Sequence, residues 1–262
     1  MMSRSSRFGF VNLVLLAFVP VAVSSCYGGG LPSLPSPPFA DQAMGGAWLG
    51  NDSNGLDVFV LSTESGRIRW IIPSTGEQGF GTASVFGAAI TINYTFVAPM
   101  GFALVDGSHS ATCTATGSIQ ERRFLYLIAN CTTDLGGTFW SAVNLVYDPV
   151  YNRDSRLSVI AGNYNDSGMV LNISASGVIF EQIPGTGCII SGQVSIINSR
   201  FNAYDLLMAF SNCVGDFALM NGVTFTGLAN LDNRDTPELL SFGVTGDVEG
   251  VTVSIAVSLP RI

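Results

Sequence analysis

Lysine is absent from the 262-residue sequence, and histidine occurs once, as His109. The lack of lysine excludes Schiff-base chemistry, a P-loop lysine and a serine–lysine catalytic pair. A single histidine without a Gly-x-Ser-x-Gly motif provides neither a zinc site nor a catalytic triad. We therefore predict a protein that is not an enzyme, with no catalytic residues, no metal site and no cofactor.

Charged residues are also scarce, at 11% of the sequence against 47% hydrophobic residues, and there are 30 glycines. This composition is typical of strands joined by tight turns. The net charge is −8, and it becomes −10 if Arg4 and Arg7 are removed with a signal peptide. Such an acidic surface is a poor partner for nucleic acid, so we expect none.

The N-terminus has the pattern of a secretory signal. Arg4 and Arg7 precede a mostly apolar run over residues 10–23, which is short for a membrane span. The run ends in Val23-Ser24-Ser25-Cys26, which resembles the lipobox of a bacterial type II signal peptide. The resemblance implies that residues 1–25 are a signal peptide and that Cys26 carries lipid, including acyl chains such as palmitate.

Residues 26–44 are predicted to tether the protein to a membrane. Glycines at 28–30 favour flexibility, and the four prolines between 31 and 38 favour an extended chain. Tyr27 stands where some lipoproteins carry the aspartate that retains them in the inner membrane. By that resemblance we expect an outer-membrane lipoprotein, and the choice between periplasmic and surface orientation stays open.

From Gly45 onward, short apolar-alternating runs between turns predict antiparallel strands. On the third run, the alternation places Ile68, Trp70 and Ile72 in the core, and Arg67, Arg69 and Ile71 on a mostly solvated face. The first predicted set of strands covers residues 46–51, 56–63, 67–73, 78–86, 88–97, 109–119, 123–131 and 137–147.

A second set of eight strands follows, and its sequence repeats the first. Ile72-Pro-Ser-Thr-Gly76 matches Ile183-Pro-Gly-Thr-Gly187, and Asn130-Cys131 matches Asn212-Cys213. We predict two tandem domains, at residues 45–150 and 151–262. The register of the repeat between residues 76 and 113 stays open. The second set of strands covers residues 161–165, 169–174, 177–183, 188–197, 203–212, 219–231, 239–246 and 250–259.

The five cysteines can be divided into one lipid-bearing residue, Cys26, and two disulfides. Cys113 and Cys131 bracket a predicted hairpin symmetrically, and so do Cys188 and Cys213. Folding each hairpin back on itself places its two cysteines opposite one another. We therefore predict the cross-strand disulfides Cys113–Cys131 and Cys188–Cys213.

The openings of the two repeats, Gly46-Ala47-Trp48 and Gly162-Asn163-Tyr164, resemble the first strand of lipocalin and avidin barrels. Tyr147-Asp-x-x-Tyr151-x-Arg153-x-Ser155 leads into the second opening, and with this motif the whole chain also resembles uncharacterised two-repeat envelope lipoproteins of proteobacteria. The lipocalin and avidin resemblance implies an all-β protein made of two eight-stranded antiparallel up-and-down barrels. A barrel of this size is either filled by side chains or holds one small ligand.

Three further motifs are interpreted as structural. Residues 51–57 resemble a calcium loop, but Ser62 stands where the loop needs glutamate, and Asn54-Gly55 is the pair preferred in a type I′ hairpin turn. Asp232, Asp235 and Glu238 are predicted to lie in a hairpin loop rather than form a catalytic carboxylate pair. His109 is predicted to be a surface or strand-end residue.

Two functions remain. The first is a lipid-anchored envelope protein that acts as a non-enzymatic interaction or structural module, with a protein partner in the envelope and its contacts on exposed loops. The alternative is a lipocalin-like binder of a small apolar ligand in one barrel, with Trp48 and Trp70 as the candidate pocket residues. A hollow barrel interior favours the second function, and a packed interior rejects it.

Overall fold

The computed structural model describes residues 41–166, 169–183 and 185–262. The signal peptide predicted for residues 1–25, the lipidated Cys26 and most of the tether predicted for residues 26–44 lie outside this part of the chain. Asp41–Ile262 belong to one compact unit, and its predicted division at residues 150 and 151 stays a prediction.

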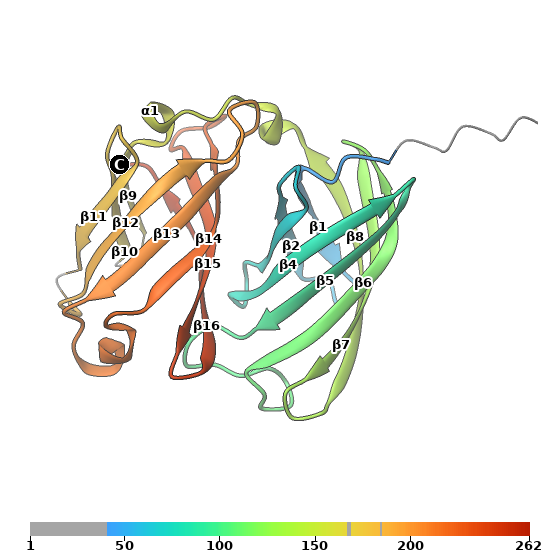
Figure 1. The fold of residues 1–262 in the computed structure, drawn as a ribbon, viewed down its shortest axis with the longest axis horizontal. Coiled ribbons are helices and arrows are strands. Elements are labelled where there is room, and N and C mark those ends of the chain that lie inside the picture. The colour runs from blue at the N-terminus through green and yellow to red at the C-terminus, as the bar shows by residue number, and fades with distance from the viewer. Residues whose placement is uncertain (1–40, 167–168, 184) are drawn as a thin grey trace, which may run out of the picture. The chain divides into compact units, whose positions relative to one another are not determined.

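The first eight strands form a closed antiparallel barrel in which each strand pairs with the next (Figure 1). The barrel closes where β1 pairs with β8, as in the opposed pair Leu49 and Val146. The strands are β1 (Gly46–Asp52), β2 (Asp57–Ser62), β3 (Arg67–Ile72), β4 (Glu77–Phe86), β5 (Ala89–Val97), β6 (Ser110–Gln120), β7 (Phe124–Thr133) and β8 (Thr138–Asp148).

The second eight strands form an antiparallel sheet in the order β9 to β16, which curls into a half-barrel. Its end strands β9 and β16 meet at a single bridge between Tyr164 and Arg261. The strands are β9 (Gly162–Asp166), β10 (Met169–Ile173), β11 (Val178–Gln182), β12 (Ile189–Ile196), β13 (Tyr204–Ser211), β14 (Thr224–Asp232), β15 (Leu239–Val248) and β16 (Val251–Pro260).

Three short helices complete the described elements: η1 (Pro149–Asn152), α1 (Leu157–Ile160) and η2 (Gly215–Met220). The structure thus confirms the all-β class and two eight-stranded antiparallel sheets. Most strand bounds agree with the predicted ones to within two residues. The largest difference is β14, which starts at Thr224 because η2 and the turn after it precede the strand.

Buried and exposed side chains alternate along the strands that form the barrel wall. On β7, every second side chain from Leu125 to Thr133 is buried, and the side chains between them are exposed. Successive side chains of a strand point to opposite faces, so one face lines the interior and the other forms the outer surface. At one end of the interior, Trp48 is fully buried, and its indole N–H donates to Ser62 Oγ at 3.2 Å.

On the outer face of β3, Arg67 is exposed as predicted, but the prediction was wrong for Arg69 and Ile71. Arg69 and Ile71 are each only 7% exposed. The guanidinium of Arg69 donates to the carbonyl of Thr226 on β14 at 2.6 Å, and Arg67 pairs with Asp205 on β13 at 2.6 Å. These residues face the second sheet, which the alternation within β3 does not reveal.

Both sheets contain one disulfide. Cys113 on β6 lies directly opposite Cys131 on β7, and the two are bonded. Cys188 and Cys213 are bonded just outside β12 and β13. The first bond therefore joins the sixth and seventh strands of its sheet, and the second joins the ends of the fourth and fifth.

Candidate ligand-binding site

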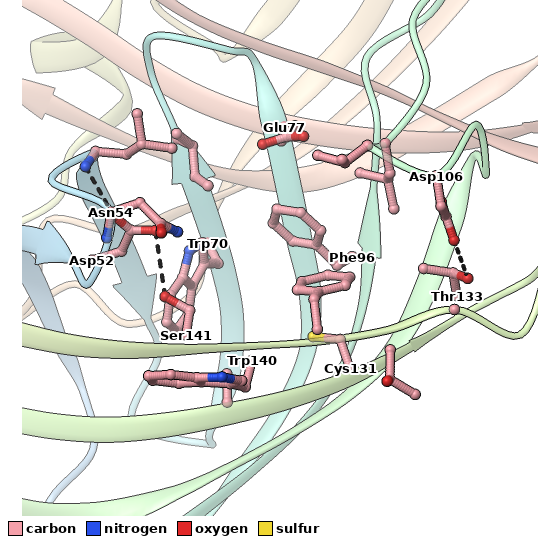
Figure 2. Close-up of a pocket in the computed structure, with 18 of the residues that line it drawn as sticks. Asp52, Asn54, Trp70, Glu77, Phe96, Asp106, Cys131, Thr133, Trp140 and Ser141 are labelled. Atoms are coloured by element: carbon pink, nitrogen blue, oxygen red, sulfur yellow. Dashed lines mark hydrogen bonds between the residues drawn. The ribbon is translucent and has the colours of Figure 1, made fainter.

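A cavity of about 460 Å³ opens at one end of the first barrel (Figure 2). Residues from the β1–β2 turn, the start of β4, the β5–β6 loop and the β7–β8 turn surround its mouth. Trp48, near the start of β1, is fully buried at the opposite end of the barrel. The first barrel is therefore hollow at one end only.

Aromatic side chains form much of the cavity wall. Trp70 on β3 and Tyr94 on β5 stack with their ring centroids 5.6 Å apart and their planes 6° apart. Phe96 on β5 packs against Phe139 on β8 at a centroid distance of 6.2 Å. The sulfur of Cys131 completes this part of the wall, 3.9 Å from the hydroxyl of Tyr94. The wall is thus largely apolar, as small-molecule pockets usually are.

The Trp70–Tyr94 stack depends on a glycine between the two rings. The two residues lie on β3 and β5, and Gly79 on the intervening β4 pairs directly with Trp70. A Cβ added at Gly79 would lie 2.8 Å from the Tyr94 ring and 3.1 Å from Trp70 Cβ. Because glycine has no side chain, the two rings can meet across β4.

A gradient in side-chain size explains why only one end is hollow. On β6, Ala111, Cys113 and Ala115 face inward near the mouth, whereas Ile119 faces inward at the far end. The inward residues of β7 change in the same way, from Leu125 and Leu127 to Ala129 and Cys131. The circumference is set by the strands, so small residues leave space that large ones fill.

Carboxylates hold the turns at the mouth in place. Asp52 Oδ1 accepts from the backbone N–H of Asn54 at 2.8 Å, and its Oδ2 accepts from Ser141 Oγ on β8 at 3.3 Å. Asp106 accepts from the hydroxyls of Ser108 at 2.5 Å and Thr133 at 2.6 Å. These hydrogen bonds, first that from Ser108, hold the pKa of Asp106 below its usual range.

The β1–β2 turn confirms the hairpin interpretation of Asn54-Gly55 and corrects its type. Only Gly55 of this pair has a positive φ, of 80°, whereas a type I′ turn needs both residues there. The N–H of Gly55 bonds to the carbonyl of Asp52, and the N–H of Asp52 bonds to the carbonyl of Leu56. This is a three-residue hairpin loop in which glycine takes the left-handed position.

The structure places the predicted pocket residues at different depths. Trp70 lines the cavity, whereas Trp48 does not and packs edge-on against Tyr147 at the closed end. Trp140 lies at the mouth and is 64% exposed. Tyr94 and Phe96 also line the cavity and were not among the predicted pocket residues. Their spacing of two in β5, in phase with Ile90 and Ile92, is the signal that could have found them.

The other motifs have structural roles. His109 is exposed, and its Nδ1 lies 3.3 Å from the carbonyl of Phe102. The segment after Asp232 is a loop between β14 and β15, as predicted. In it, Arg234 pairs with Asp232 at 2.6 Å and with Asp148 at 2.7 Å. No group of three residues that could hold a metal ion occurs within the described ranges.

The half-barrel interior is filled differently. Its core contains large side chains that are almost fully buried, such as Tyr204 on β13, Phe225 on β14 and Phe242 on β15. Phe210 and Phe225 pack edge to face, with centroids 5.2 Å apart.

No protein-family model matches the sequence, and no curated protein matches it. No helix in the part of the chain that the structure describes is long and apolar enough to cross a membrane.

Burial raises the pKa of the Tyr94 phenol above its ordinary value of about 10. The folded protein therefore keeps this proton at a pH where the unfolded chain loses it, so stability falls as the pH rises above about 10. We expect wild type to lose up to about 1.4 kcal/mol more per pH unit above pH 10 than Tyr94→Phe does. Urea unfolding at several pH values measures this difference.

Tyr126→Phe is the matched control, because it removes a hydroxyl from the outer wall of β7. If Tyr94→Phe and wild type lost stability with the same slope, the raised pKa of Tyr94 would be refuted.

Proposed function

We propose that the first barrel binds one small, largely apolar organic molecule in its open end. The observation that carries this proposal is the cavity of about 460 Å³ between Trp70, Tyr94, Phe96 and Phe139. Ligand pockets in proteins typically have volumes of about 300–1,000 Å³ and apolar walls with a few polar groups. Here the charged side chains lie at the mouth and the inner wall is mostly apolar, with the Tyr94 hydroxyl as a polar group on it, so the apolar part of a ligand would enter first.

The binding prediction uses the neutral dye N-phenyl-1-naphthylamine, whose fluorescence rises in apolar surroundings. We expect one dye molecule to bind per chain, with a dissociation constant on the order of micromolar. Ala129→Phe places a ring on the inward face of β7 inside the cavity and should weaken binding at least about tenfold. Fluorescence titration measures both constants. The protein used starts at residue 26 with Cys26→Ser and keeps the whole compact unit.

Asn130→Phe is the control for this experiment, because it adds the same ring to the outward face of the same strand. It should bind the dye like wild type. Equal binding by Ala129→Phe and Asn130→Phe would show that the dye binds outside the cavity and would refute the proposal.

A protein-interaction function is the second candidate, and an apolar patch on the outer wall of the first barrel favours it. Leu49 on β1, Val146 on β8 and Phe124 on β7 lie in one cross-strand row and are all exposed. Tyr126 and Ile128 extend this outer-wall patch along β7. Exposed apolar patches of this kind mark interaction sites in soluble proteins.

If the outer-wall patch binds an envelope protein, Phe124→Ser/Val146→Ser should abolish crosslinking to that partner while dye binding in the cavity persists. Phe86→Ser/Leu135→Ser is the matched control, because Phe86 and Leu135 are exposed apolar residues elsewhere on the barrel. Quantitative mass spectrometry of crosslinked envelopes compares the two. If the partner were recovered equally with both variants, the outer-wall patch would be ruled out as its binding surface.

Both candidate functions fit a protein anchored by lipid at Cys26 and sorted to the outer membrane, which we propose as its location. The lipobox-like Val23-Ser24-Ser25-Cys26 supports the anchor. So does the pairing of the other four cysteines in two disulfides, Cys113–Cys131 and Cys188–Cys213. With these four oxidised, Cys26 has no cysteine partner within the chain.

For the intact protein, we expect mass spectrometry to find a mature N-terminus at Cys26 that carries the mass of acyl chains. Cys26→Ser should leave the membrane fraction. Cleavage at another residue, or an unmodified Cys26, would contradict the anchor. Density-gradient separation of inner and outer membranes tests the sorting.

A further inference from the structure

The cavity has aromatic walls, and the charged side chains at its mouth are all acidic. Three carboxylates line it, each from a different turn or strand end: Asp52 at the end of β1, Glu77 at the start of β4, and Asp106 in the β5–β6 loop. Figure 2 shows these three residues around the aromatic side chains. Among the described residues that line the cavity, none is arginine or histidine.

The charge of these carboxylates is not neutralised by neighbouring cations. The ion pairs found within the described ranges involve other acidic residues, such as Asp205 with Arg67 and Glu238 with Arg261. The partners of Asp52, Glu77 and Asp106 are neutral N–H and hydroxyl donors. Donors of this kind stabilise the ionised form of a carboxylate, and they hold the pKa of Asp106 low.

The aromatic walls of the cavity also favour a positively charged ligand. The faces of aromatic rings carry negative potential and attract cations, with indole the strongest. Trp70, Tyr94 and Phe96 present such rings inside the cavity, and Trp140 adds an exposed indole at the mouth. A positive group at the mouth would therefore meet both carboxylates and ring faces, whereas a negative group would be repelled by both.

We propose that the ligand of this cavity is an amphipathic organic cation. Its apolar body lies between Trp70 and Phe96, and its ammonium or similar group lies at the mouth near Glu77 and Asp106. This inference rests on the proposed binding function and adds the charge of the ligand. An anionic ligand such as a fatty acid is disfavoured, because the cavity lining offers no basic side chain to its carboxylate.

Three probes of one shape test the inference. They are 2-naphthyltrimethylammonium, its uncharged isostere 2-tert-butylnaphthalene, and the anion naphthalene-2-sulfonate. Each is used to displace N-phenyl-1-naphthylamine from the chain that starts at residue 26 with Cys26→Ser. We expect the cation to bind at least about tenfold more tightly than the isostere, the anion to bind more weakly than both, and the preference to shrink as salt is added.

Glu77→Gln/Asp106→Asn removes two charges at the mouth and should reduce the preference for the cation to less than about threefold. The preference is the ratio of the affinities for the cation and the isostere in the same variant, so a change in the mouth that weakens both probes equally leaves it unaltered. Glu181→Gln/Glu249→Gln is the matched control, because it removes two charges from β11 and the β15–β16 turn. It should keep the full preference.

The outcomes separate the two proposals. If wild type binds no dye, the binding function fails and the inference fails with it. If the dye binds but the cation and its isostere displace it equally, the binding function stands and the cation inference is overturned. A preference for the anion overturns the inference too. The inference is also overturned if Glu181→Gln/Glu249→Gln loses the preference for the cation as fully as Glu77→Gln/Asp106→Asn does.

Discussion

The pairing of β1 with β8 is the constraint on which the rest of the first barrel depends. Once Leu49 and Val146 are opposed in this ladder, the sheet has no free edge and its circumference is set. The inward side chains then have to fill a fixed volume. Where they are large, the interior is solid, and where they are alanine, cysteine or glycine, a cavity is left.

The second sheet shows what changes without full closure. It has the same number of strands and the same antiparallel order, but in the described residues its two edges are bridged only between Tyr164 on β9 and Arg261, just after β16. Its concave face is covered by large side chains such as Tyr204 and Phe242. The two sheets therefore differ, one as a closed barrel with a cavity and the other as a half-barrel with a filled core, and the proposed small-molecule site lies in the first.

The cavity combines several features that each have a separate structural cause. The Cys113–Cys131 disulfide joins β6 to β7 and leaves a small apolar surface between the strands. Gly79 allows Trp70 and Tyr94 to stack across β4. Asp52 and Asp106 organise the turns at the mouth through hydrogen bonds. The carboxylates that stabilise these turns are therefore also the groups that give the mouth its negative charge.

Alternation and spacing along the sequence were sufficient to predict the strands and the cysteine pairs, because both depend on residues that are close in the chain. Alternation places Ile68, Trp70 and Ile72 on one face, and the symmetric spacing of Cys113 and Cys131 about a turn opposes them. The same local pattern cannot show what covers the outer face of a strand. The burial of Arg69 depends on Thr226, which is 157 residues away.

The sequence by itself determined which side chains point into the first barrel, since alternation within a strand needs no knowledge of other strands. Only the tertiary structure decided at which end each one lies. Trp48 and Trp70 both point inward, yet Trp48 fills the closed end and Trp70 lines the cavity. Their positions depend on how the eight strands are staggered when the barrel closes, and this stagger is a property of the whole sheet.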